Sequence, residues 1–295
     1  MESNRSDGLS RLKDYWALTK PEVNFLVLIA TWVGFDLGWR GPFRLLPLVH
    51  TLLGTLVVAS GTATLNQYVE RTFDAQMRRT ALRPLPAGRL RSFEALVLGL
   101  ALSIGGAAYL AIAVNPLASA LALITLVSYL ALYTPLKRRT AWCMVVGAFP
   151  GAMPPLIGWA AARGSLNFEA WVLYGMLFLW QFPHFLSIAW MYRDDYARAG
   201  YRMLPSWDGA GRLMAWQVAI SSLFLLPVSL VPVWLGGAGV IYFCGALLLG
   251  LGFSAYGMRL AASRSKAVAR KMLLASIVYL PLVLALMALD KKGVT

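Results

Sequence analysis

The sequence predicts an all-α, polytopic membrane protein with nine transmembrane helices, and three observations lead to this prediction. Only 14% of the 295 residues are charged, far fewer than the roughly 25% typical of soluble domains. The mean hydropathy is +0.63. Long apolar runs recur along the chain, and a helix needs about 20 mostly apolar residues to cross a bilayer core. These features exclude a soluble globular domain.

Each of the nine apolar runs has about the length of a membrane span. They cover residues 22–39, 45–65, 93–113, 116–135, 141–162, 168–191, 213–235, 238–258 and 271–289. The first contains Asp36, and the fifth is interrupted by Pro150, Pro154 and Pro155. We expect one intramembrane domain over residues 1–295, with an N-terminal tail at 1–20 and long polar loops at 66–92 and 192–212.

Lys and Arg are concentrated on one side of the predicted bilayer. If the N-terminus is cytoplasmic, 22 of the 27 basic residues lie in the tail and in the loops after the even-numbered spans. Cytoplasmic loops carry such an excess of positive charge. We therefore expect the N-terminus inside and the C-terminus outside, in a bacterial inner membrane. The net charge of +14 then reflects topology and attraction to anionic lipid or substrate, and it requires no nucleic-acid partner.

The first long loop begins "NQYVERTFDAQMRRT" and places three ligand-type side chains at helical spacing. Asn66, Glu70 and Asp74 lie four residues apart and share one helix face. Carboxylates at a helix C-terminus are disfavoured by the helix dipole, so cations should compensate for them. Two kinds of cation are available: a metal ion, or the arginines at 71, 78, 79 and 83. An Asn carbonyl and two carboxylates, completed by water and phosphate oxygens, suit Mg²⁺.

The second long loop, "YRDDYARAGYRMLP", carries another acidic cluster. Asp194, Asp195 and Arg198 fall within about one and a half helical turns. Both loops could simply be solvated helix ends with salt bridges and topology-setting arginines. However, two acidic clusters on one face of the membrane flank an apolar interior. This combination favours a metal-bridged diphosphate site with an apolar tail running into the bundle.

Two further segments carry candidate functional groups. Lys137, Arg138 and Arg139 end the fourth span in "YTPLKRRT", where they either set topology or neutralise a departing diphosphate. His184 lies at membrane depth in "WQFPHF". It could orient a polar substrate, transfer protons, meet an iron porphyrin, or hydrogen-bond between helices. On a regular helix, His184 and Asp195 would share a face.

Taken together, these motifs resemble the UbiA-type intramembrane prenyltransferases, over roughly residues 15–290. The Asn66–Asp74 pattern running into "RPLPAGR" and the "YRDDYARAG" loop are typical of the superfamily. The stretches "YTPLKRRT", "GAFPGAMPPLIGWAA" and "WQFPHF" are similar to the branch that farnesylates protohaem IX. Glu70 stands where the family more often has Asp.

The resemblance implies nine helices around a central cavity, with the two acidic motifs facing each other at its cytoplasmic mouth. It implies an enzyme, in which Mg²⁺ is held by Asn66, Glu70, Asp74, Asp194 and Asp195. The groups implied to bind substrate are Arg71, Arg78, Arg79, Arg83, Tyr133, Lys137, Arg138, Arg198 and His184.

The implied reaction transfers a farnesyl group from farnesyl diphosphate to a vinyl group of haem B (protohaem IX). The products are haem O and diphosphate. The resemblance also implies that the protein is surrounded by membrane lipid. It implies that haem O is passed to a haem A synthase or to a terminal oxidase assembly.

Two other functions stay open at this point. An aromatic prenyltransferase making a quinone precursor needs a similar diphosphate site but not "WQFPHF". An ion-coupled transporter is the more remote alternative, because transporters place their ion site near the bilayer midplane. The choice between a farnesyl and a geranylgeranyl donor is also open, because it depends on the depth of the tunnel.

Overall fold

The computed structural model describes residues 2–292, with the side chains of residues 2–9 and 206–207 excepted. Within this range the chain is built from helices. In chain order these are α1 (Glu2–Leu18), α2 (Pro21–Gly38), α3 (Leu45–Asp74), α4 (Ser92–Ala113), α5 (Pro116–Val127), the π-helix η1 (Ser128–Tyr133), α6 (Thr134–Leu136), α7 (Cys143–Gly151), α8 (Pro154–Arg163), α9 (Phe168–Met191), α10 (Arg193–Arg198), α11 (Leu204–Trp207), α12 (Arg212–Trp234), α13 (Val240–Ser263) and α14 (Lys266–Leu289).

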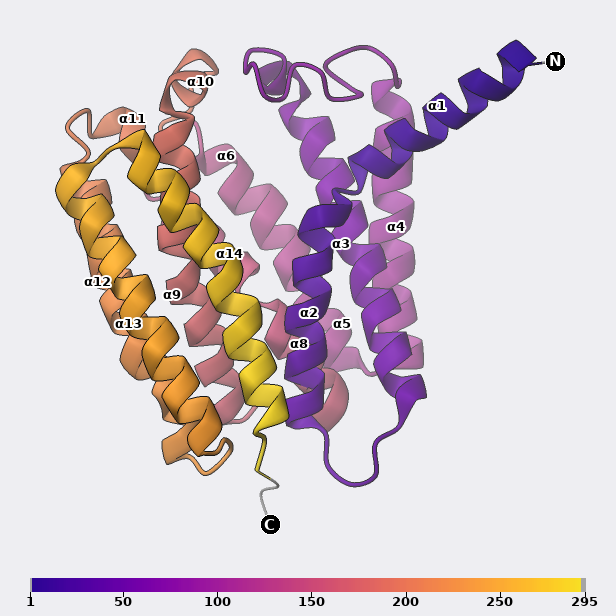
Figure 1. The fold of residues 1–295 in the computed structure, drawn as a ribbon. Coiled ribbons are helices and arrows are strands. Elements are labelled where there is room, and N and C mark those ends of the chain that lie inside the picture. The colour runs from indigo at the N-terminus through magenta and orange to yellow at the C-terminus, as the bar shows by residue number, and fades with distance from the viewer. Residues whose placement is uncertain (1, 293–295) are drawn as a thin grey trace.

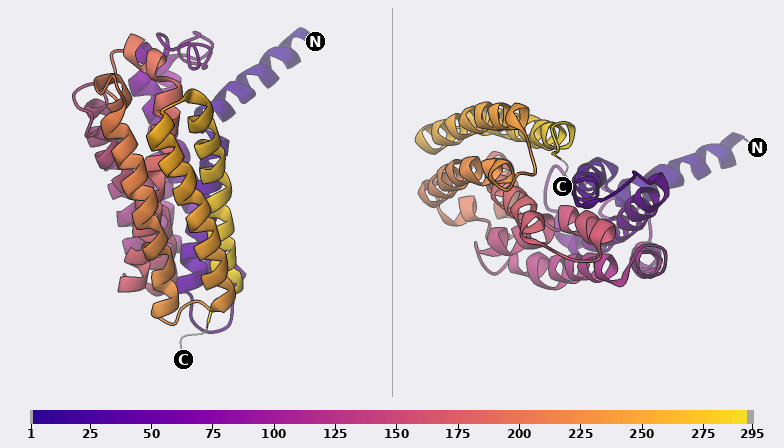
Figure 2. Two further views of the ribbon diagram at one scale, coloured as in Figure 1. Left: turned by 60° about the vertical axis from the view of Figure 1, so that its left-hand side comes forward. Right: turned by 90° about the horizontal axis from the view of Figure 1, so that it is seen from below.

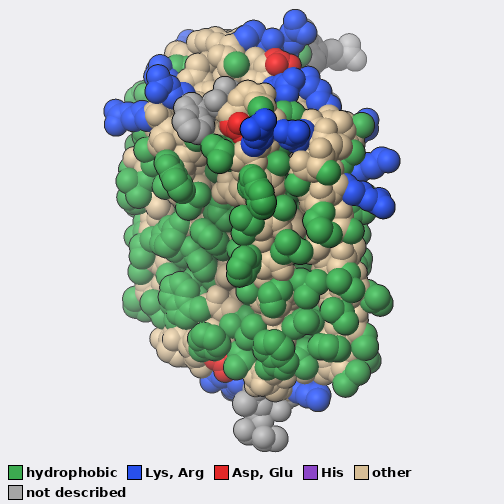
Figure 3. Space-filling model, turned by 90° about the vertical axis from the view of Figure 1, so that its left-hand side faces the viewer, with side chains coloured by type: hydrophobic (Ala, Val, Ile, Leu, Met, Phe, Trp, Pro, Cys, Tyr) green, Lys and Arg blue, Asp and Glu red, His purple; other side chains and the backbone are tan. Residues whose placement is uncertain are grey.

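The prediction of an all-helical membrane protein is confirmed. Eight segments of the described chain are long and apolar enough to span a bilayer, and they correspond to the second to ninth predicted spans. The first predicted span, 22–39, forms α2, which packs against α3 and α8. Figure 3 shows a broad hydrophobic band between two ends that carry the Lys and Arg side chains. An integral membrane protein follows from this distribution.

The fifth predicted span is broken, as its prolines suggest. α7 ends at Gly151 and α8 begins at Pro154. This pair is the most buried of the eight candidate spans, at 72% of its apolar window. α8 also crosses α2 closely: a Cβ added at Gly34 would lie 2.1 Å from the carbonyl oxygen of Pro155. Small residues thus allow the two backbones to touch.

The two long polar connections lie at one end of the bundle. Figure 1 shows residues 75–91, α10 and α11 at the same end as the N-terminal helix α1, and the last turn of α14 at the other end. Seen from below in Figure 2, α13 and α14 lie across the molecule from α4 and α3. α1 projects outward, and its last turns are held by ion pairs from Arg11 to Glu94 (2.8 Å) and from Arg89 to Asp14 (3.0 Å).

The α2–α8 crossing predicts a selective response to added side-chain volume. Gly34→Ala should lower the free energy of unfolding by about 1–3 kcal/mol, because its new methyl group has no space. Gly105→Ala in α4 is the matched control, since a Cβ there meets nothing within 4 Å. Thermal unfolding in detergent measures both variants. Equal stability of the two would show that the crossing tolerates a methyl group.

Candidate functional site

The first acidic motif lies on the last turns of α3. The helix continues without a break to Asp74, so residues 66–74 of the predicted loop are helical. Asn66, Glu70 and Asp74 are 1%, 5% and 1% exposed. They form the polar ridge that their spacing predicts, and this ridge is buried rather than solvated.

Each member of the ridge is held by a basic side chain. Lys20 donates a hydrogen bond to Oδ1 of Asn66 (2.9 Å), Lys137 pairs with Glu70 (2.8 Å), and Arg83 pairs with Asp74 (2.7 Å). These cations come from three segments that are distant in sequence. Cationic compensation at the end of α3 is therefore present, and it is supplied by protein side chains.

A π-helical segment places Lys137 over the ridge. The widened turn of η1 runs directly into α6 and then Lys137, and such turns often mark functional sites. The Lys137 ammonium lies 4.5 Å from the ring centroid of Tyr133. Thr134 is tied to the ridge by a hydrogen bond from the Asn66 amide (3.4 Å). The segment that ends the fourth span thus becomes one wall of the site.

The second acidic motif lies close by but points elsewhere. Asp194 is exposed and pairs with Lys266 (3.2 Å) at the start of α14, and Asp195 pairs with Arg198. The hydrogen bond from Lys266 lowers the pKa of Asp194 below its usual value. α9 ends at Met191 and α10 starts at Arg193. The expectation that His184 and Asp195 share one regular helix face is therefore wrong.

The two motif regions touch through Arg79. Its guanidinium donates to the Tyr196 hydroxyl (2.6 Å) and lies 5.2 Å from the ring centroid of Tyr192. Arg138 stacks 4.3 Å from the ring centroid of Phe73. Thus two of the predicted basic residues, from separate segments, lie beside the ridge or its partner loop.

Two other predicted substrate contacts are placed differently. Arg71 turns back on its own helix, donating to the backbone oxygen of Tyr68 (2.6 Å). Arg78 is exposed. Neither lies against the acidic ridge in this structure.

Three residues of the site carry no sequence pattern that predicts a functional role. Lys20 precedes Pro21 at the start of α2, and a single Lys at the end of a tail carries no motif. Tyr201 donates to Oε1 of Glu70 (3.2 Å), and Tyr196 meets Arg79. Both tyrosines lie in the stretch "YARAGYRMLP", which directly follows the two aspartates from which the sequence predicts a metal site. Burial lowers the pKa of Lys20 to about 8.

His184 lies below this polar end, on α9. Its Nδ1 is 2.7 Å from the hydroxyl oxygen of Ser276 on α14, and its ring stacks on Trp180 with centroids 4.7 Å apart. The side chain therefore joins α9 to α14, as expected for a histidine between helices. Its second ring nitrogen is left for other contacts.

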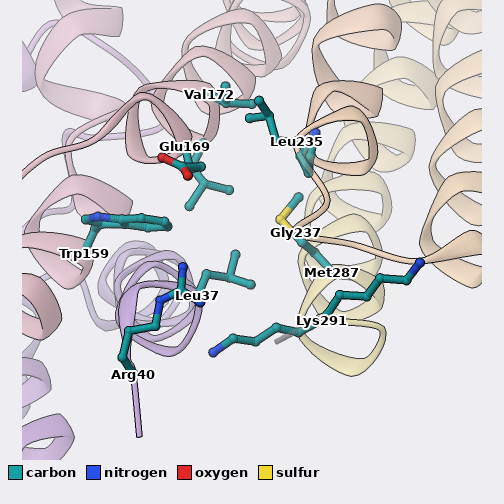
Figure 4. Close-up of a pocket in the computed structure, with 12 residues that line it drawn as sticks. Leu37, Arg40, Trp159, Glu169, Val172, Leu235, Gly237, Met287 and Lys291 are labelled. Atoms are coloured by element: carbon teal, nitrogen blue, oxygen red, sulfur yellow. The ribbon is translucent and has the colours of Figure 1, made fainter. Parts of the chain in front are cut away.

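Two cavities lie away from the ridge. One of about 680 Å³ is lined by residues of α7, α9 and α12, with Arg139 and Arg202 among them. The other is at the opposite end of the bundle, where Figure 4 shows Arg40 and Lys291 beside Trp159 and Glu169. Neither is lined by Glu70 or Asp74.

The donor set of the ridge fits a hard divalent cation by its chemistry, since it offers one amide and two carboxylate groups. Among the described residues, no three His, Cys, Asp or Glu side chains converge on one point. The protein alone therefore supplies only part of a metal shell. Oxygens from water and from a bound anion would have to complete it.

Comparison with known proteins gives closely similar relatives. The chain is 52% identical to the protoheme IX farnesyltransferase of Solibacter usitatus, covering 96% of this chain and 100% of that protein. It is 49% identical to the protein of the same name from Koribacter versatilis, covering 96% and 94%.

Solved structures share the fold at low identity. A digeranylgeranylglyceryl phosphate synthase superposes with a TM-score of 0.78 at 17% identity, covering 95% of this chain and 98% of the other. A UbiA homologue from Archaeoglobus fulgidus, bound to DMAPP and Mg²⁺, gives 0.66 at 16% identity, covering 93% and 99%. Residues 27–279 match the UbiA prenyltransferase family. The chain therefore belongs to the UbiA prenyltransferase family.

Proposed function

We propose that this protein is a protohaem IX farnesyltransferase. It transfers a farnesyl group from farnesyl diphosphate to a vinyl group of haem B, forming haem O and releasing diphosphate. The relatives at 52% and 49% identity, matched over nearly their full length, support the choice of substrates. The observation that carries the chemistry is the buried ridge of Asn66, Glu70 and Asp74, ringed by cations from three segments.

Diphosphate release is the step that this ridge and its cations serve. An allylic diphosphate ionises when negative charge on the leaving group is stabilised in a water-poor site. Lys20, Arg83 and Lys137 converge on the ridge and can turn their N–H groups to phosphate oxygens. Arg79, Arg138 and Arg198 lie at the rim, where they would hold the diphosphate as it leaves.

Mg²⁺ suits the oxygen donors of the two motifs by their chemistry. The residues that would hold it are Asn66, Glu70 and Asp74 of the first motif, together with Asp194 and Asp195 of the second. When bound, the metal supplies Lewis-acid charge to the diphosphate oxygens. The lysines and arginines that pair with these acids in this structure would then be free to bind phosphate.

The allylic cation needs protection from water and nucleophiles until haem attacks it. Aromatic faces can stabilise such a cation. Tyr133 lies under Lys137 and packs at a tilt against Tyr129, with 5.1 Å between the ring centroids. Attack by the vinyl group forms a carbon–carbon bond to the farnesyl group and leaves a positive charge on the carbon next to the porphyrin ring. Water adds to this carbon and gives up a proton to the released diphosphate or to solvent, which completes the hydroxyethylfarnesyl substituent. This sequence requires no nucleophilic side chain on the protein.

We place the protein in the bacterial inner membrane, with the acidic motifs on the cytoplasmic side. Residues 75–91, α10 and α11 lie at the end that carries α1 (Figure 1). These polar segments contain Arg78, Arg79, Arg83, Arg89, Arg91, Arg193 and Arg198. Positive charge is retained on the cytoplasmic side during insertion.

This orientation predicts that the C-terminus lies outside the cytoplasm. A topology reporter fused after the last residue should therefore be active outside the cytoplasm and inactive inside it. Handover of haem O to a haem A synthase or an oxidase assembly would follow within the membrane.

The first prediction from this proposal concerns the product. Membranes containing the protein, given farnesyl diphosphate, haem B and Mg²⁺, should form haem O, identified by mass spectrometry. The control replaces haem B with 4-hydroxybenzoate. A prenylated benzoate without haem O would replace this proposal with an aromatic prenyltransferase.

The second prediction concerns the acids. Asp74→Asn and Asp194→Asn should each reduce haem O formation at least about 10²-fold, because each removes a carboxylate that the proposal assigns to the metal. Asp194 is 67% exposed, so its substitution carries little risk to folding, which size-exclusion elution would check. Glu94→Gln, which breaks the peripheral pair with Arg11, is the matched control. Unchanged turnover in Asp194→Asn would remove that residue from the site.

The third prediction concerns Lys20 and pH. Its pKa is lowered from 10.5 to about 8, so the charged form is present below pH 8 and is lost as the pH rises through it. We expect kcat/KM for farnesyl diphosphate to fall above pH 8. Lys20→Arg should shift this fall to higher pH, because arginine keeps its charge. The exposed Lys13→Arg is the control. An identical alkaline fall in Lys20→Arg would assign the titration to another group.

A further inference from the structure

The hydrogen bonds around His184 determine which of its nitrogens carries the proton. The hydroxyl of Ser276 donates to the backbone oxygen of Leu273 (2.6 Å). A serine has one hydroxyl hydrogen. When Leu273 takes that hydrogen, the serine oxygen accepts at the 2.7 Å contact and Nδ1 of His184 donates. This arrangement satisfies both contacts of Ser276 at once and puts the imidazole hydrogen on Nδ1. In the neutral imidazole, Nε2 is left with a bare lone pair.

The ring that presents this lone pair is held on a second side. Trp180 stacks on it, with the planes inclined by 24°. The indole Nε1 of Trp180 in turn donates to the backbone oxygen of Ser276 (2.9 Å). Ser276 thus fixes the tautomer of His184 directly and fixes its stacking partner through the backbone. Such support on the nitrogen away from the ligand is characteristic of histidines that bind metals.

Nε2 is accessible and has no partner among the described residues. The hydrogen bond that the ring makes within the described part of the chain uses Nδ1. Among the described residues, Nε1 of Trp190 and the hydroxyl oxygen of Tyr279 are fully buried and lack a hydrogen-bond partner. Nε2 of His184 is not in this group of fully buried atoms. The side chain is half-buried. A good nitrogen ligand is therefore available within the apolar part of the bundle.

The position along α9 suits an acceptor that lies deeper than the diphosphate. Tyr192, which meets Arg79 of the first motif, is eight residues after His184, or about 12 Å along the helix axis. Phe185, beside His184, is 43% exposed. An iron porphyrin bound at this depth would have an apolar wall along its ring. The edge of the ring, with its vinyl groups, could then face the acidic motifs.

We infer that Nε2 of His184 is an axial ligand of the iron of the haem acceptor, and that Ser276 is the positioning residue that keeps this nitrogen unprotonated and aimed. The inference rests on the proposed function, because it names the contact by which that site recognises haem. Imidazole is a common protein ligand of haem iron. No bond is made or broken on the iron during prenyl transfer.

The test is a titration of the purified full-length protein in detergent with haem B, followed by absorption and magnetic circular dichroism. The wild type should show imidazole ligation, His184→Ala should lose it, and His184→Cys should change it to a thiolate signature. Ser276→Ala should raise the Kd for haem about 10-fold or more, as loss of such a supporting contact does. Ser276→Thr, which keeps a hydroxyl, should restore it.

Ser187→Ala is the matched control. Ser187 is also fully buried on α9, and its hydroxyl returns to the backbone of its own helix, so haem binding should be unchanged. An imidazole signature that persists in His184→Ala would overturn the inference, as would a Ser276→Ala variant with wild-type affinity. Haem O formation is measured in parallel on the wild type. If it forms while His184 proves unligated, the inference fails alone; if it never forms, the proposed function fails.

Discussion

The burial of two carboxylates at the C-terminal end of α3 is the constraint on which the rest of the site depends. Glu70 and Asp74 are almost completely buried, where the helix dipole also disfavours them. Removing one partner of a buried ion pair typically costs about 3–5 kcal/mol. The chain therefore has to bring cations to this point, and it does so with Arg83 and Lys137, while Lys20 holds Asn66.

The need of Glu70 and Asp74 for cationic partners determines how the segments at this end of the bundle are arranged. The segment after α3 folds back to deliver Arg83, and the π-helical turn at the end of the fourth span delivers Lys137. Tyr201, from the loop between α10 and α11, bonds to the same carboxylate as Lys137. In the proposed mechanism, these groups exchange their present partners for a metal ion and a diphosphate. The same charged side chains therefore form the ion pairs of this structure and would bind the metal ion and the diphosphate in the proposed reaction.

The apolar interior has a separate requirement, which is close packing. Without a hydrophobic drive between helices in lipid, packing and interhelical hydrogen bonds hold them together. α2 and α8 meet through Gly34 and Gly158, where an added Cβ would overlap a backbone oxygen. α9 and α14 meet through Trp180, His184 and Ser276. The polar pairs among these contacts orient side chains as well as joining helices.

Much of the helical framework could be predicted because membrane crossing imposes length and apolarity locally. Residues 168–191 were predicted as a span, and α9 has those bounds. Other boundaries were less accurate where a polar segment continues a helix: α3 extends nine residues beyond the predicted end at 65. An apolar run stops at the membrane surface, whereas the backbone hydrogen bonds of a helix can continue beyond it. The hydropathy pattern therefore underestimates the length of such a helix.

The sequence by itself determined the class of protein, the grouping of the polar loops and the ridge of Asn66, Glu70 and Asp74. Composition, charge asymmetry and four-residue spacing are properties of short stretches of chain. Only the tertiary structure decided which cation meets which acid, that Arg71 turns away, and that Lys20 and Tyr201 join the site. Those pairings join segments up to 131 residues apart. They depend on how the helices are placed against one another, which no local pattern encodes.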